Sequence, residues 1–141
     1  MGNFHSTVQK INFEDMQTVC KNPEVYLLIN ILPDVEQECL IKGTILASQE
    51  EALITRHMTG NKYIQIIIYG RNGDDEKIIK KYSQLKSAGF FNIYIYSGGL
   101  FEWLILQDIY GFDEFPTTIK QIDFLKYKCP QKLNVGLLTN Y

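Results

Sequence analysis

The sequence predicts an α/β fold with a parallel central sheet and helices on both of its faces. Segments rich in β-forming residues at 25–32, 63–69 and 91–96 alternate with segments whose apolar residues recur at helical spacing. The segment at 25–32 is nearly continuously apolar, which is typical of a strand that helices cover on both faces. The chain has 141 residues, of which 45% are hydrophobic and 21% charged, and this suits one domain with one core.

The first third of the chain predicts a helix and then a strand. Asn12 is expected to cap a helix that runs to Cys20, because apolar residues follow it at helical spacing. The strand at 25–32 is predicted to lie centrally in the sheet and to end before Pro33. A helical turn is expected over 34–40, and Gly43 is expected to turn the chain after it.

Ser48 and Glu51 have the spacing of a capping box and predict a second helix over about residues 49–57. His57 lies near its end, where a cation would complement the helix dipole. His5 lies in the N-terminal segment. Neither histidine has a neighbouring Cys or second His to complete a ligand set, so no metal site and no cofactor are predicted.

The second half of the chain predicts strand, loop, helix, strand and helix. The strand at 63–69 leads into a loop at 70–75, and a helix starts near Asp75 and ends at Gly89. Its expected core face consists of Ile78, Ile79, Tyr82 and Leu85, with its lysines turned outward. The strand at 91–96 is followed by a helix whose Trp103 is predicted to lie in the core.

Charge and cysteine content exclude several classes of function. A net charge of −2 gives no broad attraction to nucleic acid, so nucleic acid is not an expected partner. The longest apolar runs are far shorter than the roughly 20 residues that span a bilayer. Cys20, Cys39 and Cys129 have no metal-type spacing, and no secretory leader is expected, which favours a reducing, cytoplasmic setting.

The N-terminus carries a lipidation pattern. Met1 is followed by Gly2, and Ser6 supplies the small hydroxyl residue that N-myristoylation requires four positions after the glycine. We therefore expect Gly2 to be acylated and the protein to be peripheral to a membrane. A single myristoyl chain binds only marginally, with an association constant on the order of 10⁴ M⁻¹, so a partner or second lipid is needed for stable attachment.

The loop after the strand at 63–69 has the shape of an active-site loop but contains no nucleophile. Its glycines permit positive φ, and successive amides entering a helix can accept an anion. The carboxylates at its end compete for the same amides and complement the helix dipole. The candidate site residues are Gly70, Arg71, Asn72, Gly73, Asp74 and Asp75.

This loop, with the Gly89-Phe90 and Gly98-Gly99 pairs and Trp103 beyond it, resembles the rhodanese domain of sulfurtransferases. The resemblance covers about residues 11–118 and implies the three-layer rhodanese-like fold. In that family the loop reads Cys-Arg-x-Gly-x-Arg, and the Cys carries a persulfide. Arg71 and Gly73 fit this pattern, whereas Gly70 stands at the Cys position and Asp75 at the position of the last Arg.

The resemblance implies a catalytically inactive rhodanese-like module that binds a protein partner or has a regulatory role, and the pattern at Gly2 predicts that myristate directs it to a membrane. Glycine offers no group for covalent catalysis. One alternative is a sulfurtransferase that uses a displaced cysteine. Another is a structural component of a membrane-associated or viral assembly, which would place the protein in the virion.

The organisation expected is an acylation segment at 1–10, a rhodanese-like domain at 11–118 and a C-terminal extension at 119–141. The extension contains too many apolar residues for a disordered tail and is expected to pack back on the domain or form an interface. Tyr94, Tyr96 and Tyr110 are expected to pack, with an exposed recognition patch as the alternative.

Overall fold

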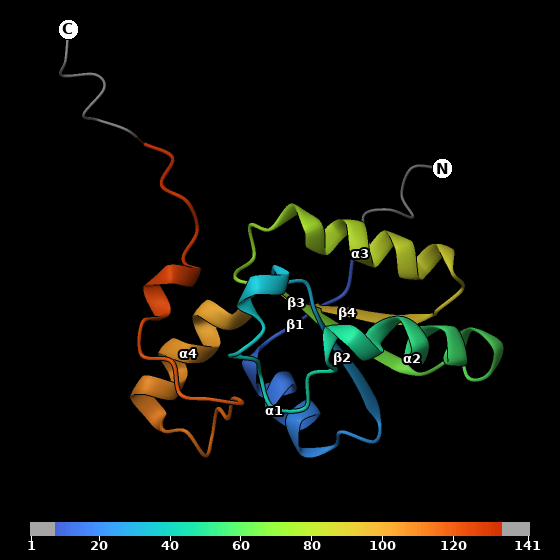
Figure 1. Cartoon of the computed structure of the whole chain (residues 1–141), viewed down its shortest axis with the longest axis horizontal. Helices are drawn as coiled ribbons and strands as arrows, with labels where there is room; N and C mark the ends of the chain where they lie inside the picture. The colour runs from blue at the N-terminus through green and yellow to red at the C-terminus, as the bar shows by residue number, and fades with distance from the viewer. Residues whose placement is uncertain (1–7, 134–141) are drawn as a thin grey trace, which may run out of the picture.

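The computed structural model describes residues 8–133, in which a four-stranded parallel sheet has the strand order β1-β4-β3-β2 (Figure 1). The strands are β1 (Lys10–Ile11), β2 (Tyr26–Asn30), β3 (Gln65–Tyr69) and β4 (Asn92–Tyr96). The register pairs Leu28 with Ile67, and Ile67 with Tyr94. This architecture confirms the predicted α/β fold.

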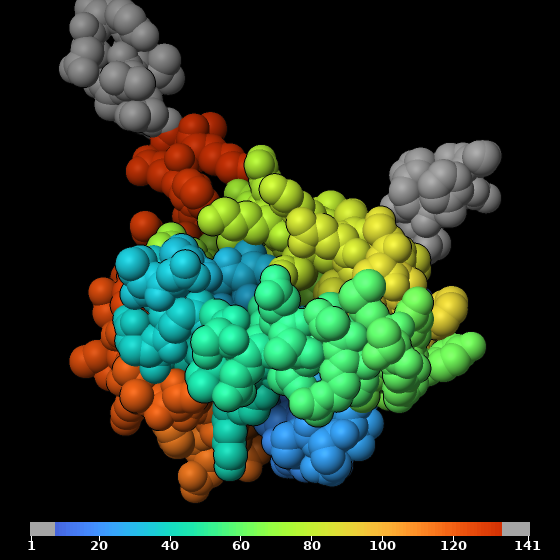
Figure 2. Space-filling model, turned by 45° about the vertical axis from the view of Figure 1, so that its right-hand side comes forward, coloured from blue at the N-terminus to red at the C-terminus, as the bar shows by residue number. Residues whose placement is uncertain are grey.

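Four helices cover the two faces of the sheet (Figure 1). Helices α1 (Phe13–Lys21) and α4 (Gly99–Tyr110) pack on one face, and α2 (Ala47–Thr59) and α3 (Glu76–Ser87) pack on the other. Figure 2 shows α2 in green beside α3 in yellow on the second face. Two short 3-10 helices, η2 (Asp34–Glu36) and η3 (Phe124–Tyr127), lie outside these layers. Within the described residues, no helix is long and apolar enough to cross a bilayer.

The strand residues supply two separate cores because successive side chains point to opposite faces of the sheet. Ile67 and Tyr69 of β3 pack with α1 and α4, whereas Ile66 and Ile68 pack under α3. Trp103 of α4 is fully buried on the first face, as the sequence predicts. Such burial on both faces explains why the strands read as continuous apolar runs.

The prediction of a central position for β2 is wrong, because β2 is an edge strand and β3 lies between β2 and β4. Its free edge is covered by the segment that follows Gly43. Thr44 forms an isolated parallel bridge with Leu28, and the Ile45 amide donates to the Leu28 carbonyl at 2.8 Å. Any strand of this sheet that helices cover on both faces is apolar, whether it is central or at the edge. The apolar sequence of β2 therefore does not predict its position in the sheet.

The predicted capping box at Ser48 and Glu51 is also wrong. Helix α2 begins at Ala47 with Leu46 at the N-cap, and no side chain caps it. None of the side chains of α2 is buried. In α3, Asp75 is the N-cap as predicted, but Ile79 is 51% exposed, so the core face of this helix is narrower than the pattern suggests.

Helix α1 begins at the predicted residue and has a complete capping box. The Asp15 amide donates to Asn12 Oδ1 at 3.0 Å, and the Asn12 amide donates to Asp15 Oδ2 at 3.2 Å. Two first-turn amides are therefore satisfied by side chains.

We expect Asn12→Ala to lower the free energy of unfolding by about 1 kcal/mol, because the substitution leaves the Asp15 amide without its partner. Ser48→Ala is the matched control, since Ser48 makes no cap hydrogen bond, and it should change stability by less than about 0.5 kcal/mol. Urea denaturation of both variants measures the difference. Equal losses in the two variants would contradict this assignment of the caps.

Candidate functional site

The loop at 70–75 lies at the carboxyl edge of the sheet, between the end of β3 and the start of α3 (Figure 1). In open parallel sheets, ligands bind outside this edge. The segment after β2, which contains η2, and the turn between β4 and α4 follow the neighbouring strands. Three segments from different parts of the chain therefore meet around the loop.

Backbone hydrogen bonds hold the loop against the first turn of α4. The Leu100 amide donates to the Gly70 carbonyl at 2.9 Å, and the Phe101 amide donates to the Arg71 carbonyl at 2.8 Å. Two glycines permit this close approach. A Cβ on Gly99 (φ +67°) would lie 2.8 Å from the Arg71 carbonyl oxygen, and one on Gly73 would lie 2.8 Å from the Ser97 carbonyl oxygen.

Neither Gly70 nor Gly73 has the positive φ that glycine permits. Position 73 requires glycine because the backbone of Ser97 lies where a Cβ would stand, and not because of its backbone conformation. The sequence identifies these glycines as loop residues but gives no sign of which segment lies against them.

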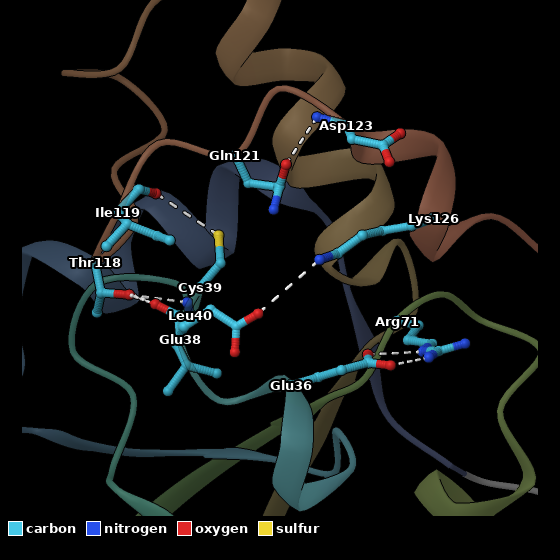
Figure 3. Close-up of polar contacts among 10 residues, drawn as sticks. All are labelled: Glu36, Glu38, Cys39, Leu40, Arg71, Thr118, Ile119, Gln121, Asp123 and Lys126. Carbon is cyan, nitrogen blue, oxygen red and sulfur yellow. Dashed lines mark hydrogen bonds and ion pairs between the residues drawn. The ribbon is translucent and has the colours of Figure 1, made fainter.

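The Arg71 guanidinium is engaged by Glu36 of η2 and does not stand free for an anion (Figure 3). Arg71 Nε donates to Glu36 Oε1 at 3.0 Å, and Arg71 Nη2 contacts Glu36 Oε2 in the same fork. The hydrogen bond with Glu36 raises the pKa of Arg71. Sequence analysis did not find Glu36 as a partner, because it lies 35 positions away.

The polar side chains of the loop bond to the loop itself and to α3. Asp75 caps α3 by accepting from the Lys77 amide at 3.0 Å, and Asn72 Oδ1 accepts from the Asp74 amide at 2.9 Å. These bonds occupy two amides that an anion would otherwise use. Beside them is an open pocket of about 290 Å³, lined by Arg71, Asn72, Asp74, Asp75, Glu76, Lys77, Lys128 and Pro130.

Position 70 itself faces an apolar side chain and a carboxylate. A Cβ on Gly70 would lie 2.7 Å from Ile31 Cδ1 and 3.4 Å from Asp75 Oδ2. A side chain here would have to displace Ile31. An anionic group at this position would also be repelled by Asp75.

The C-terminal extension reaches the loop, which the sequence did not predict. Tyr127 of η3 is fully buried, and its carbonyl accepts a 2.7 Å hydrogen bond from Asn72 Nδ2. Lys126 extends toward Glu38 with a separation of 4.0 Å (Figure 3), and Lys132 lies 3.3 Å from Asp74. The only signal in the sequence was the apolar content of this extension.

The three cysteines lie in different environments. Burial raises the pKa of Cys20 to about 11. Burial also raises the pKa of Cys39, whose thiol donates to the Ile119 carbonyl at 3.6 Å (Figure 3). Cys129 is exposed in the extension. A thiolate is the nucleophilic form, so Cys20 and Cys39 are poor nucleophiles near neutral pH.

The alternative of a recognition patch formed by three tyrosines is wrong. Tyr96 is fully buried and donates to Glu102 Oε1 at 2.6 Å, whereas Tyr110 is 65% exposed. Tyr94 is half-buried against the first core.

No group of three or more His, Cys, Asp or Glu side chains in residues 8–133 is placed to hold a metal ion. Gly2 and His5 lie outside the described residues.

Comparison with protein families finds that the rhodanese-like domain matches residues 20–106. No curated protein matches the chain. Among solved structures, a rhodanese-like domain from Anabaena sp. has a TM-score of 0.56 at 20% identity and covers 91% of each chain. A second Anabaena structure has a TM-score of 0.55 at 23% identity, over 76% of this chain and 89% of that one.

A protein from Lactobacillus plantarum has a TM-score of 0.55 at 23% identity, over 70% of this chain and 83% of that one. At these identities the solved structures support the fold alone.

We expect a thiol placed by Gly70→Cys, in a Cys129→Ser background, to have a pKa above its ordinary value of about 8.5, because Asp75 repels the thiolate. Adding Asp75→Asn should lower that pKa. The pH dependence of reaction with a thiol reagent measures both values, with the Cys129→Ser protein as the blank. A thiol pKa below about 7 with Asp75 present would refute this account of the loop.

Proposed function

We propose that this chain, which belongs to the rhodanese-like domain family, is a non-catalytic member that binds a protein partner and is directed to a membrane through acylated Gly2. The observation that carries the proposal is Gly70, because it stands where the family pattern places the cysteine that carries sulfur. Without a thiol at this position, the loop has no group that can form a persulfide.

The environment of the loop supports a binding role over sulfur transfer. Arg71 is held by Glu36, and Asp75 caps α3. The loop therefore presents carboxylates where an anionic sulfur donor would need positive charge. Its backbone hydrogen bonds with α4 involve no side chain of the loop, so the loop with Gly70 keeps a fixed shape for binding.

Sulfur transfer by another cysteine has one observation in its favour. Cys129 is exposed and lies between Lys128 and Pro130, which both line the pocket beside the loop. Cys20 and Cys39 are unsuited, because burial raises the pKa of both thiols. This candidate function therefore depends on Cys129 alone.

We predict that the wild-type protein forms no thiocyanate from thiosulfate and cyanide above the buffer rate, because position 70 has no thiol. Colorimetric detection of thiocyanate measures this, with Cys129→Ser as the matched variant. Activity that is present in the wild-type protein and lost in Cys129→Ser would overturn the non-catalytic proposal and establish the displaced cysteine.

The membrane part of the proposal is tested by the intact mass of the protein from eukaryotic cells. We predict that the wild-type protein carries one myristoyl group and that Gly2→Ala carries none, since acylation needs the amine of an N-terminal glycine. The acylated form should bind vesicles weakly and reversibly, and the variant should not bind them. A wild-type protein whose N-terminus is unmodified or acetylated would remove the membrane from the proposal.

A further inference from the structure

The C-terminal extension lies across the loop as a ligand would. Tyr127 is fully buried, its carbonyl accepts from Asn72 of the loop, and Lys128 and Pro130 line the pocket of about 290 Å³ beside it. Figure 2 shows this segment in red beside the beginning of α3. Residues 126–132 thus follow the loop at the carboxyl edge of the sheet, where ligands of parallel α/β proteins bind.

Charge on the two sides of this contact is complementary. The segment contributes Lys126, Lys128 and Lys132. The surface beneath it contributes five carboxylates and two cations, Lys77 and Arg71. The carboxylates are Glu36, which pairs with Arg71, and Glu38, Asp74, Asp75 and Glu76. The surface is therefore acidic overall and suits a basic peptide.

The anchor of the segment is the Tyr127 ring, and its hydroxyl is not used. The ring packs in the first core with Cys39 and Leu40. Among the residues that the structure describes, the buried Tyr127 hydroxyl has no hydrogen-bond partner. A buried hydroxyl without a partner reduces the benefit of burying the ring, so a phenylalanine would fill this position at least as well.

The flanking contacts are weak because they face solvent. The Lys132 and Asp74 side chains are 74% and 43% exposed, and those of Lys126 and Glu38 are 36% and 53% exposed. Exposed ion pairs contribute little to stability. The segment is held mainly by one buried ring and one buried hydrogen bond, which makes it an occupant that another segment of the same chemistry can replace.

We propose that the face formed by the loop at 70–75, η2 and the first turn of α4 binds a lysine-flanked aromatic segment of another protein, and that residues 126–132 are its resident occupant. This inference rests on the proposed binding function and names its site and partner chemistry. The partner segment carries Phe or Tyr at the anchor and lysines around it. The resident segment competes with it at the high effective concentration of a tethered ligand.

A fluorescent peptide with the sequence of residues 122–133, with Ser in place of Cys129, tests the proposal by fluorescence anisotropy. The full-length chain is used as wild type and as Lys126→Glu/Lys132→Glu, which places two carboxylates against Glu38 and Asp74 and so repels the resident segment without changing the core. Because the resident segment masks the site, the wild type should bind the peptide at least about tenfold more weakly than the variant does. Tyr127→Ala is a second released variant, with folding checked by circular dichroism.

Peptide variants test the chemistry of recognition. A Phe anchor should bind as tightly as Tyr or more tightly, and an Ala anchor or Glu in place of the lysines should abolish binding. Within the released variant, Asp74→Lys should weaken binding at least fivefold. Glu24→Lys, an exposed charge reversal in the turn before β2, is the matched control and should leave binding unchanged.

Three outcomes would overturn the proposal. The first is a folded released variant that fails to bind the peptide. The second is equal binding of the peptide that has Ala at the anchor. The third is a wild-type dimer that is lost in Tyr127→Ala, because it would assign the site to the extension of a second copy. None of these outcomes alters the thiocyanate or mass predictions, so the two proposals fail separately.

Discussion

The contact on which this structure depends is the direct packing of one loop backbone on another at the carboxyl edge of the sheet. The Gly70 and Arg71 carbonyls of the loop after β3 accept hydrogen bonds from amides in the first turn of α4. Gly99 and Gly73 leave no room for a Cβ between the two segments. These contacts involve only backbone atoms and two positions without a side chain, so the hydrogen bonds of the loop with α4 do not require any particular side chain at position 70.

The polar side chains of the loop are hydrogen-bonded to other parts of the same chain. Arg71 donates to Glu36, and Asp75 accepts from the Lys77 amide at the start of α3. Asn72 donates to the Tyr127 carbonyl of the extension. A surface that could hold an anion through amides and arginine instead presents carboxylates. Lysines of the extension lie opposite two of them, Glu38 and Asp74. These carboxylates are the basis for the basic ligand that we propose.

The sequence predicted the fold well because parallel strands under helices leave a strong apolar pattern, and because Asn12 and Asp75 are local capping signals. It failed where the outcome depended on distant residues. The edge position of β2 depends on the segment after Gly43, and the partner of Arg71 lies in η2. The capping box at Ser48 failed because α2 begins two residues earlier than predicted, at Ala47. The burial of Tyr127 against the loop had no local signal, since the extension shows only general apolarity.

Residues 126–132 occupy the loop face through the Tyr127 ring. Hydrogen exchange of the full-length protein, measured by mass spectrometry, tests this contact most directly by comparing wild type, Tyr127→Phe and Tyr127→Ala. We expect the backbone amides of residues 70–77 and 39–41 to exchange faster in Tyr127→Ala than in the wild type. In Tyr127→Phe they should exchange at the wild-type rate, and the amides of α2 should be unchanged in both variants. Unchanged exchange at residues 70–77 in Tyr127→Ala would contradict the account.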